Sequence, residues 1–216
     1  MLNPEQLQRL AKHTVKSAHP PKTDLQTKID PRETYSNVLS GVVKLTKTAR
    51  DGRQQIVGLQ FAPDFMGRPY SDNDDMTATA STNVRLCSFP ASVLAELIEE
   101  TPAIERRMFQ QKMAELDEAR DWLFALGRKT APEKVASFLL LIATHAEPER
   151  TGNEAFEIDL PLKRAEIADF LGLTIETVSR QMTKLRHAGV IDVRDRNTIH
   201  IYRIDDLRQA SCVETG

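Results

Sequence analysis

The spacing of apolar residues along this chain changes twice, and each spacing predicts a different kind of structure. An amphipathic helical pattern covers residues 4–16, and the next segment, 18–34, contains three prolines and little periodicity, which is typical of turns and short edge strands. From residue 35 to residue 89 the apolar residues recur in short runs with a period near two. This region is therefore predicted to form an antiparallel barrel or roll.

An Asp51-Gly52 pair separates two β-type runs of that region, 35–48 and 54–61. The pair predicts a hairpin because glycine readily adopts the positive φ of a tight turn. In the second run, Val57, Leu59 and Phe61 alternate with Ile56, Gly58 and Gln60, so one face is expected to be more deeply buried. After a polar loop, RPYSDNDD, residues 76–89 are predicted to form one further β segment.

Beyond residue 90 the apolar spacing becomes helical. A short helix is predicted to end near Thr101-Pro102, and a long, strongly charged helix over residues 102–126 is predicted to end at Gly127. The apolar residues of the long helix are Phe109, Met113, Leu116, Trp122 and Leu123. Because a helix this polar needs a cover for its apolar stripe, we expect a dimer seam formed by Phe109, Met113, Leu116 and Leu123 with a second copy. The alternative is that the stripe packs on the chain's own barrel.

A capping box marks the next helix. Thr130 is the predicted N-cap and Glu133 the residue that reaches back to it. The apolar residues that follow at helical spacing are Val135, Phe138, Leu139 and Ile142. Residues 127–130 are therefore a predicted hinge between domains.

The segment after this helix predicts a winged helix-turn-helix. It contains a short strand, a helix over residues 163–171, a turn at Gly172-Leu173, a second helix over residues 175–188 and a two-stranded wing. Gly172 permits two helices to cross steeply, and Gly189 supplies a left-handed stop after the second helix.

The second predicted helix carries two stripes of different character. The stripe that is predicted to be buried consists of Ile175, Val178, Met182 and Leu185. The polar stripe that is predicted to be free consists of Glu176, Ser179, Arg180 and Thr183. A winged helix-turn-helix places the exposed N-terminal part of this helix in the DNA major groove. Arginine can donate two hydrogen bonds to guanine, glutamate can accept from the cytosine amino group, and serine can pair with several base edges, so Glu176, Ser179 and Arg180 are candidates for reading bases.

Basic and hydroxyl side chains around the polar stripe are candidates for phosphate contacts. Between residues 174 and 203, six basic residues face three acidic ones, a local excess of three positive charges in a chain of formal net charge −2. DNA binding by an acidic protein requires such a local surface. The candidate backbone contacts are Thr174, Thr183, Lys184, Arg186 and Arg196, with Arg194 and Arg203 beside them.

Each of these residues also has a purely structural interpretation. Glu176 can complement the positive end of the helix dipole, Arg180 can pair with Glu176 one turn away, and Thr174 can serve as the N-cap. The cap, the glycine turn, the two stripes and the wing together favour DNA reading.

Composition narrows the other possibilities. The 216 residues are 40% hydrophobic and 28% charged, which is ordinary for a folded protein in solution. No apolar run approaches the roughly 18 residues of a membrane span, and the start lacks a secretion signal, so we expect a cytoplasmic protein without a membrane partner. Two distant cysteines give neither a disulfide framework nor a zinc pattern.

The motif Glu176-Thr-Val-Ser179-Arg180 resembles the E-x-x-S-R reading motif of the CRP/FNR superfamily of bacterial transcription regulators. The resemblance runs from about residue 2 to residue 208 and is greatest to the FNR-like anaerobic regulators of alphaproteobacteria, the group called FnrL or FnrN. The similar segments are DGRQQIVGLQFAPDFMGRPY, LDEARDWLFALGRKTAPEKVASFL and LTIETVSRQ.

This resemblance implies an α+β fold with an N-terminal antiparallel β-roll like a cyclic-nucleotide-binding domain, a long dimerisation helix and a C-terminal winged helix-turn-helix. The expected domains are a sensor roll with flanking helices (1–101), a dimerisation helix and hinge (102–129) and a DNA-binding domain (130–216). It also implies a homodimer on double-stranded DNA palindromes of the type TTGAT-N4-ATCAA, control of oxygen-linked anaerobic metabolism, and contact with RNA polymerase. By the motif, Arg180 would read the guanine, Glu176 the cytosine and Ser179 a thymine, in half-sites about 10 base pairs apart.

Two departures from the family pattern concern ligands. Cyclic-nucleotide-binding members carry a Gly-Glu pair and a later Arg-Ser or Arg-Thr pair, where this chain has Gly67-Arg68 and TATAST, so no cyclic nucleotide is expected. FNR proteins hold a 4Fe–4S cluster with three closely spaced N-terminal cysteines and one cysteine on a roll strand. Cys87 matches the last of these, and the other three are absent.

The start LNPEQLQRLAKHT resembles the segment that follows the third cluster cysteine. Two interpretations stay open: the true start lies upstream and a longer form holds the 4Fe–4S cluster with Cys87 as a ligand, or the cluster has been lost, as in FixK-like relatives. For the chain as given we expect no cofactor, because one thiolate cannot hold a cluster that normally needs four. Cys87 is then a small apolar strand residue.

Other classes of function have less support. No phosphate-binding G-x-x-x-x-G-K loop, G-x-S-x-G elbow or H-E-x-x-H motif is present, so we expect no enzyme. An effector-binding roll that acts mainly through protein partners, including RNA polymerase, is the remaining alternative, and such a protein should lack a preference for the palindrome.

Overall fold

The computed structural model describes residues 4–25, 34–67, 76–150 and 152–212. Contacts divide the chain into two compact units, Met1–Ala119 and Arg120–Gly216, and the boundary falls inside one long helix. The three-part division at residues 101 and 129 stays a prediction.

The first unit begins with helix α1 (Pro4–His13), which is shorter than predicted. Residues 15 and 16 belong instead to β1 (Val15–His19), which pairs antiparallel with a strand far along the chain and brings Lys16 opposite Cys87. The predicted helix over residues 4–16 is therefore wrong in its last turn, because a ladder of strand hydrogen bonds overrides a local helical pattern.

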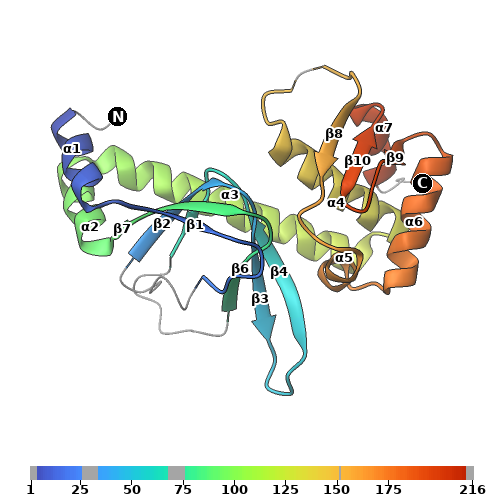
Figure 1. Ribbon diagram of the computed structural model, residues 1–216, viewed down its shortest axis with the longest axis horizontal. Coiled ribbons are helices and arrows are strands. Elements are labelled where there is room, and N and C mark those ends of the chain that lie inside the picture. The colour runs from blue at the N-terminus through green and yellow to red at the C-terminus, as the bar shows by residue number, and fades with distance from the viewer. Residues whose placement is uncertain (1–3, 26–33, 68–75, 151, 213–216) are drawn as a thin grey trace. The chain divides into compact units, whose positions relative to one another are not determined.

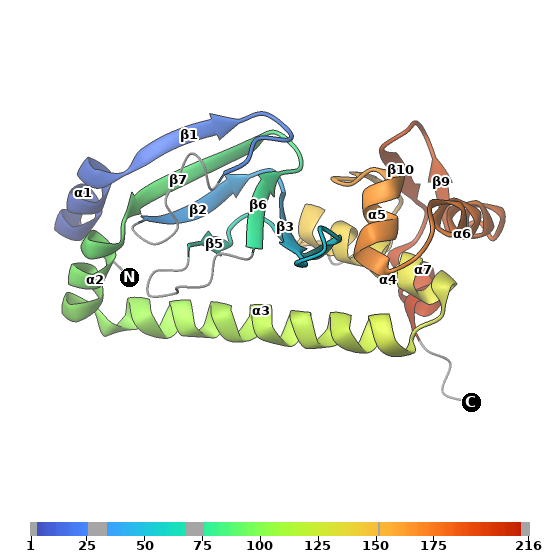
Figure 2. The same ribbon diagram turned by 90° about the horizontal axis from the view of Figure 1, so that it is seen from below.

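Two antiparallel sheets form the roll of the first unit (Figure 1 and Figure 2). The strand order is β1-β7-β2-β5 in one sheet and β4-β3-β6 in the other. The further strands are β2 (Thr34–Ser40), β3 (Val43–Thr48), β4 (Gln54–Gln60), β5 (Phe65–Met66), β6 (Met76–Ala80) and β7 (Val84–Pro90). The buried cluster inside the roll consists of Leu25, Val38, Val43, Ala78, Ala80, Val84 and Leu86. The predicted antiparallel roll is confirmed.

The predicted hairpin joins β3 to β4, and Gly52 adopts a φ of +84° in its turn. The alternation expected in β4 is wrong at Val57. The ladder pairs Leu45 with Gly58 and then Thr46 with Ile56, so Val57 is an extra, bulged residue. The bulge turns Val57 outward, where its side chain is 44% exposed, and buries both Ile56 and Leu59.

The single β segment predicted for residues 76–89 is instead two strands, β6 and β7, separated by a turn. The Ser81 N–H donates to Val42 O at 2.8 Å, and the Thr82 hydroxyl accepts the Val42 N–H at 2.9 Å. In this way polar residues of the turn satisfy backbone groups at the start of the neighbouring strand. The turn was not recognised in the sequence because the segment is rich in threonine. The predicted loop RPYSDNDD lies outside the described residues.

Two consecutive helices follow the roll, α2 (Ala91–Glu100) and α3 (Pro102–Arg128). The break at Thr101-Pro102 is where the prediction put it. The predicted end at Gly127 is early by one residue, since α3 includes Gly127 and continues to Arg128. A glycine lowers helix propensity but keeps its hydrogen bond, so it does not by itself end a helix.

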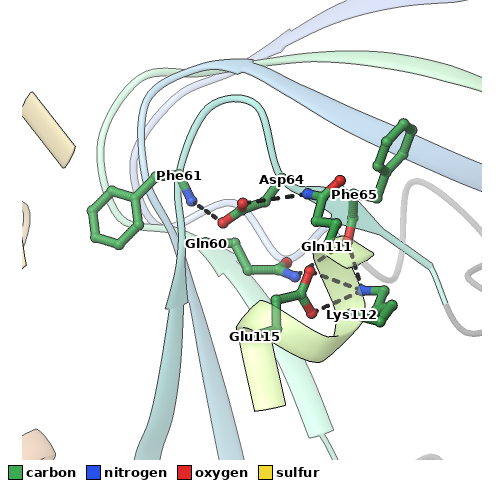
Figure 3. Close-up of polar contacts among 7 residues, drawn as sticks. All are labelled: Gln60, Phe61, Asp64, Phe65, Gln111, Lys112 and Glu115. Carbon is green, nitrogen blue, oxygen red and sulfur yellow. Dashed lines mark hydrogen bonds and ion pairs between the residues drawn. The ribbon is translucent and has the colours of Figure 1, made fainter. Parts of the chain in front are cut away.

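A closed cluster of polar groups ties the roll turn after β4 to α3 (Figure 3). Asp64 accepts the Phe61 N–H at 2.8 Å and the Gln111 amide at 3.4 Å. The Lys112 ammonium donates to Phe65 O at 3.2 Å and to Glu115 at 2.8 Å. Each of these donors meets an acceptor within the cluster, and we refer to these residues as the roll–α3 cluster.

The second unit contains α4 (Ala131–Ala146), preceded by Thr130, whose N–H and hydroxyl both donate to the Glu133 carboxylate at 2.7 Å. The predicted capping pair is confirmed, and Val135, Phe138, Leu139 and Ile142 are buried. The remaining elements are β8 (Phe156–Asp159), α5 (Arg164–Leu171), α6 (Ile175–His187), β9 (Ile191–Val193), β10 (Thr198–Ile201) and α7 (Ile204–Ser211). They form the predicted winged helix-turn-helix, with a three-stranded sheet of order β8-β10-β9.

Helix α7 was not predicted. Ile204 and Leu207 are buried, and α7 packs on α4. The i, i+3 apolar pair, with Asp205 and Asp206 in the first turn, was the available signal. None of the described helices is long and apolar enough to cross a membrane.

Candidate nucleic-acid interface

The turn between α5 and α6 sets the position of α6. Gly172 lies in the left-handed region with a φ of +61°, and the Leu173 N–H donates to Ala168 O at 2.9 Å. A left-handed residue at this point redirects the chain within two residues. Behind the turn, Ile167, Phe170 and Leu171 of α5 are buried.

The buried face of α6 differs from the predicted stripe at one end. Val178, Met182 and Leu185 are buried as predicted, but Ile175 is 47% exposed. Gln181, on the opposite border of this face, is buried and only 4% exposed. The predicted stripe extended too far because Ile175 is the first residue of the helix, where one turn of packing surface is missing.

The four residues of the polar stripe, Glu176, Ser179, Arg180 and Thr183, are all exposed, as predicted. Thr174 is the N-cap of α6, and its hydroxyl accepts the Thr177 N–H at 3.2 Å. The backbone N–H of Glu176, followed by the Thr174 hydroxyl, holds the pKa of the Glu176 carboxyl below its usual range. The carboxylate therefore stays ionised and able to accept at neutral pH. Glu176 can therefore both stabilise the start of α6 and accept a hydrogen bond from a ligand.

Arg180 contacts Thr177 among the described residues, and Glu176 makes no ion pair with it there. The Arg180 Nη2 donates to Thr177 Oγ1 at 3.5 Å. The Thr183 hydroxyl donates to Ser179 O at 3.0 Å, which commits its hydrogen within the helix. A phosphate contact by Thr183 stays a prediction, and it would require that hydrogen to turn outward.

Basic residues around α6 and the wing fall into two groups. Lys184 and Arg186 are exposed on α6, and Arg196 is exposed in the turn between β9 and β10. Arg194 lies 3.5 Å from Glu157 and 3.2 Å from Asp192, so its charge is already paired on the sheet. Arg203 lies 4.0 Å from Asp206.

Asp195 organises the wing turn that carries Arg196. One carboxylate oxygen accepts the backbone N–H groups of Asn197 and Thr198, each at 2.8 Å. These bonds, the Asn197 bond first, lower the pKa of the Asp195 carboxyl. The unit thus contains an exposed polar edge on α6. Helix α6 also contacts β9, the first strand of the wing (Figure 1).

Thr177 was missed by sequence reasoning. It lies three residues after the cap Thr174 and three residues before Arg180, so all three share one edge of the helix. The predicted stripe through Glu176 did not include this neighbouring edge, although the spacing by three was the signal for it.

A second candidate surface lies on α3. On a helical wheel of about 100° per residue, the partly buried stripe and the apolar exposed stripe are centred roughly 135° apart. The partly buried stripe consists of Ile104, Met108, Gln111, Glu115, Glu118 and Trp122. The predicted seam residues are exposed in the single chain: Phe109 65%, Met113 37%, Leu116 43% and Leu123 71%. The alternative that this stripe packs on the chain's own roll is wrong, and Trp122 does not belong to it, since its ring packs 4.7 Å from Phe170.

The cysteines do not form a metal site in the part of the chain that is described. Cys87 is half-buried on β7, opposite Lys16 and Asn37, and Cys212 lies in the other unit. No group of three His, Cys, Asp or Glu residues that could hold a metal ion occurs among the described residues. Gly67 has a φ of +124°, and Arg68 lies outside the described residues.

Comparison with known proteins gives two family matches. Residues 133–210 match the Crp-like helix-turn-helix domain, and residues 20–101 match the cyclic nucleotide-binding domain. A Rhizobium leguminosarum bv. viciae protein named "Probable transcriptional activator" is 50% identical over 208 residues, 96% of this chain and 86% of that protein. The transcriptional activator protein FnrL of Cereibacter sphaeroides is 41% identical over 172 residues, 79% of this chain and 69% of its own length.

Among solved structures, that of FixK2 from Bradyrhizobium japonicum superposes with a TM-score of 0.79 at 26% identity. The superposition covers 94% of this chain and 99% of the FixK2 chain. Roll, long helix and winged helix-turn-helix are thus shared along nearly the whole length.

Proposed function

This chain belongs to the Crp/FNR family of transcription regulators, and from that premise we propose that it is a dimeric regulator that reads TTGAT-N4-ATCAA-type palindromes in promoters of oxygen-linked, anaerobic metabolism. The observation that carries the proposal is the edge of α6, where Glu176, Ser179 and Arg180 are exposed beside a buried face. Those residue types match the donors and acceptors of guanine, cytosine and thymine in the major groove.

The phosphate contacts are assigned to exposed side chains around that edge. Lys184, Arg186 and Arg196 supply positive charge, and Thr174 and Thr183 supply hydroxyl groups. Arg194 and Arg203 are omitted because acidic neighbours already hold them. Counterion release by the three basic residues should make binding weaken steeply with salt.

The exposed seam on α3 is the surface that we assign to contact with the second copy. Four large apolar side chains at helical spacing stay uncovered in the single chain, which is an unfavourable arrangement in water unless a partner covers them. A parallel pair of α3 helices would cover both seams and give two reading helices for the two half-sites. Contact with RNA polymerase follows from the role of an activator and has no surface assigned.

With respect to the signal, we propose that the chain is a regulator without a 4Fe–4S cluster, comparable to FixK-like relatives. For the residues given, Cys87 is the one cysteine of the roll, and four thiolates are the normal ligand set of a 4Fe–4S cluster. A longer form with further cysteines could hold the cluster through Cys87. An absorption spectrum of anaerobically reconstituted protein separates the two: iron–sulfur absorption that disappears in Cys87→Ser would contradict the cluster-free proposal.

The DNA proposal is tested by fluorescence anisotropy with the full chain. One labelled duplex carries TTGAT-N4-ATCAA and a second carries the same bases scrambled, each titrated at several salt concentrations. We expect tighter binding to the palindrome, typically by a factor of about 10³ or more. Equal affinity for both duplexes would contradict the proposed function and favour a roll that acts through protein partners.

A further inference from the structure

A chain of hydroxyl groups runs along the edge of α6 and ends at Arg180. The Thr177 N–H donates to Thr174 Oγ1 at 3.2 Å, and the Thr174 hydroxyl donates to Thr177 Oγ1 at 3.1 Å. Arg180 Nη2 in turn donates to Thr177 Oγ1 at 3.5 Å. The three residues are spaced by three along the helix, so their side chains follow one another on its surface.

The helix cap fixes one of these bonds. Thr174 Oγ1 must accept a backbone N–H, because the first N–H groups of a helix have no partner inside it. The single hydrogen of the Thr174 hydroxyl faces two acceptors, Thr177 Oγ1 and the Glu176 carboxylate. The Thr177 oxygen is left presenting lone-pair density to Arg180, and a guanidinium, which only donates, is the group that such an oxygen suits.

From this geometry we propose that Thr177 is a positioning residue for the base-reading side chain of Arg180, a role that rests on the proposed function. One terminal nitrogen of the guanidinium is turned toward Thr177, and the remaining N–H groups stay available for guanine O6 and N7. An arginine side chain is long and freely rotating in solution. Restricting it before binding lowers the entropy that binding has to remove.

A different role for the same hydroxyl would be to bind a phosphate, because the Thr177 hydrogen is not used by the bonds above. The two roles predict different results when the hydroxyl is removed. Removal of a phosphate-binding hydroxyl weakens binding to all sequences alike, whereas removal of a positioning hydroxyl weakens only the preference for guanine.

The test uses the full-length chain and four duplexes: the palindrome, the palindrome with the guanine pair of both half-sites replaced, and the scrambled forms of each. Thr177→Val removes the hydroxyl but keeps the shape of the side chain and the backbone N–H that Thr174 accepts. Thr177→Ser keeps the hydroxyl and is the matched control. Affinities are measured across a range of salt concentrations.

We expect Thr177→Val to lower the guanine preference by about 3- to 10-fold, the scale of ordering one long side chain. Thr177→Ser should retain most of the preference, and the salt dependence should be unchanged in both variants. An equal loss of affinity on all duplexes, with a shallower salt dependence, would overturn the positioning role and assign Thr177 to a phosphate. An unchanged preference in Thr177→Val would also overturn it.

Coupling to Arg180 gives a second readout. In an Arg180→Ala background, Thr177→Val should cause no further loss of guanine preference, because its proposed effect acts only through the arginine. A further loss of the same size would refute the role even if the single variant behaved as expected. A parent chain without any guanine preference would instead refute the proposed function itself, and that result is visible before any Thr177 variant is made.

Discussion

The roll–α3 cluster (Figure 3) and the start of α6 each contain a cationic side chain. The two regions differ in how many intramolecular hydrogen bonds that side chain makes. In the first, Lys112 and Gln111 donate to Phe65, Glu115 and Asp64, and each donor is used within the cluster. At the start of α6, Arg180 has one long bond to Thr177 and its other donors face solvent. A cation that has partners stabilises its own unit, whereas a cation with donors to spare can bind something else.

The same contrast exists between the two sides of α3. The side with Gln111 and Glu115 meets the roll, while the side with Phe109 and Leu116 is exposed. Residue type alone therefore does not separate exposed surfaces from supporting ones in these two regions, whereas the number of intramolecular partners does.

Leu116→Glu should have the largest effect on DNA binding. A charge in the middle of the exposed seam would be buried without a partner in a pair of α3 helices, so the second copy should be lost. Affinity for the full palindrome should fall by about 100-fold or more, because the two half-sites are then bound independently. Sedimentation velocity should show a monomer, and persistence of a dimer would contradict the seam. Lys12→Met, an exposed change elsewhere in the same unit, is the control.

Arg180→Ala should have the next largest effect, and only on specific binding. We expect a loss of about 1–3 kcal/mol on the palindrome, with relaxed preference at the guanine. Stability should be unchanged within about 0.5 kcal/mol, since exposed side chains outside networks contribute little to folding. An equal loss on scrambled DNA in the anisotropy titration would mean that Arg180 contacts a phosphate.

Lys112→Met should show the reverse behaviour. Removing the ammonium takes away the partner of Glu115 and one of two donors to Phe65 O, the other being the Gln60 amide at 3.4 Å. The free energy of unfolding should therefore fall by about 0.5–1 kcal/mol, a small value because the pair is partly exposed. The guanine preference should not change. Urea unfolding measures the change in stability. A variant that is as stable as the parent chain but has an altered DNA specificity would contradict the prediction.

Glu176→Gln should give the smallest effect, measured as stability without DNA. The native carboxyl has a lowered pKa, owing first to its own backbone N–H, so the unfolded chain takes up the proton first as pH falls. The stabilisation is fully present above the unfolded pKa of about 4.3 and is lost as pH falls through the lower native value. The variant should therefore be less stable than the parent at about pH 6, and the two should converge in urea titrations as pH falls below the native pKa of the carboxyl. A difference that does not depend on pH would show that the carboxylate charge is not responsible.

Local signals in the sequence were sufficient for much of the fold and for the exposed polar edge of α6. Thr130 with Glu133, Gly52 in its hairpin and Gly172 between two helices act within one turn of chain, so their neighbours in sequence already contain the cause. The free stripe of Glu176, Ser179 and Arg180 follows in the same way from the period of one helix.

The tertiary structure decided what depends on distant segments. Pairing with β7 converted residue 16 from helix to strand, and a bulge against β3 exchanged Val57 for Ile56 in the core. Carboxylates on β8 and β9 hold Arg194, while Arg196 stays exposed. Which side of α3 is left uncovered was also decided by the roll. Helix caps, tight turns and periodicity are properties of a few consecutive residues, whereas burial and pairing depend on which segments the folded chain brings together, and a single sequence does not state that.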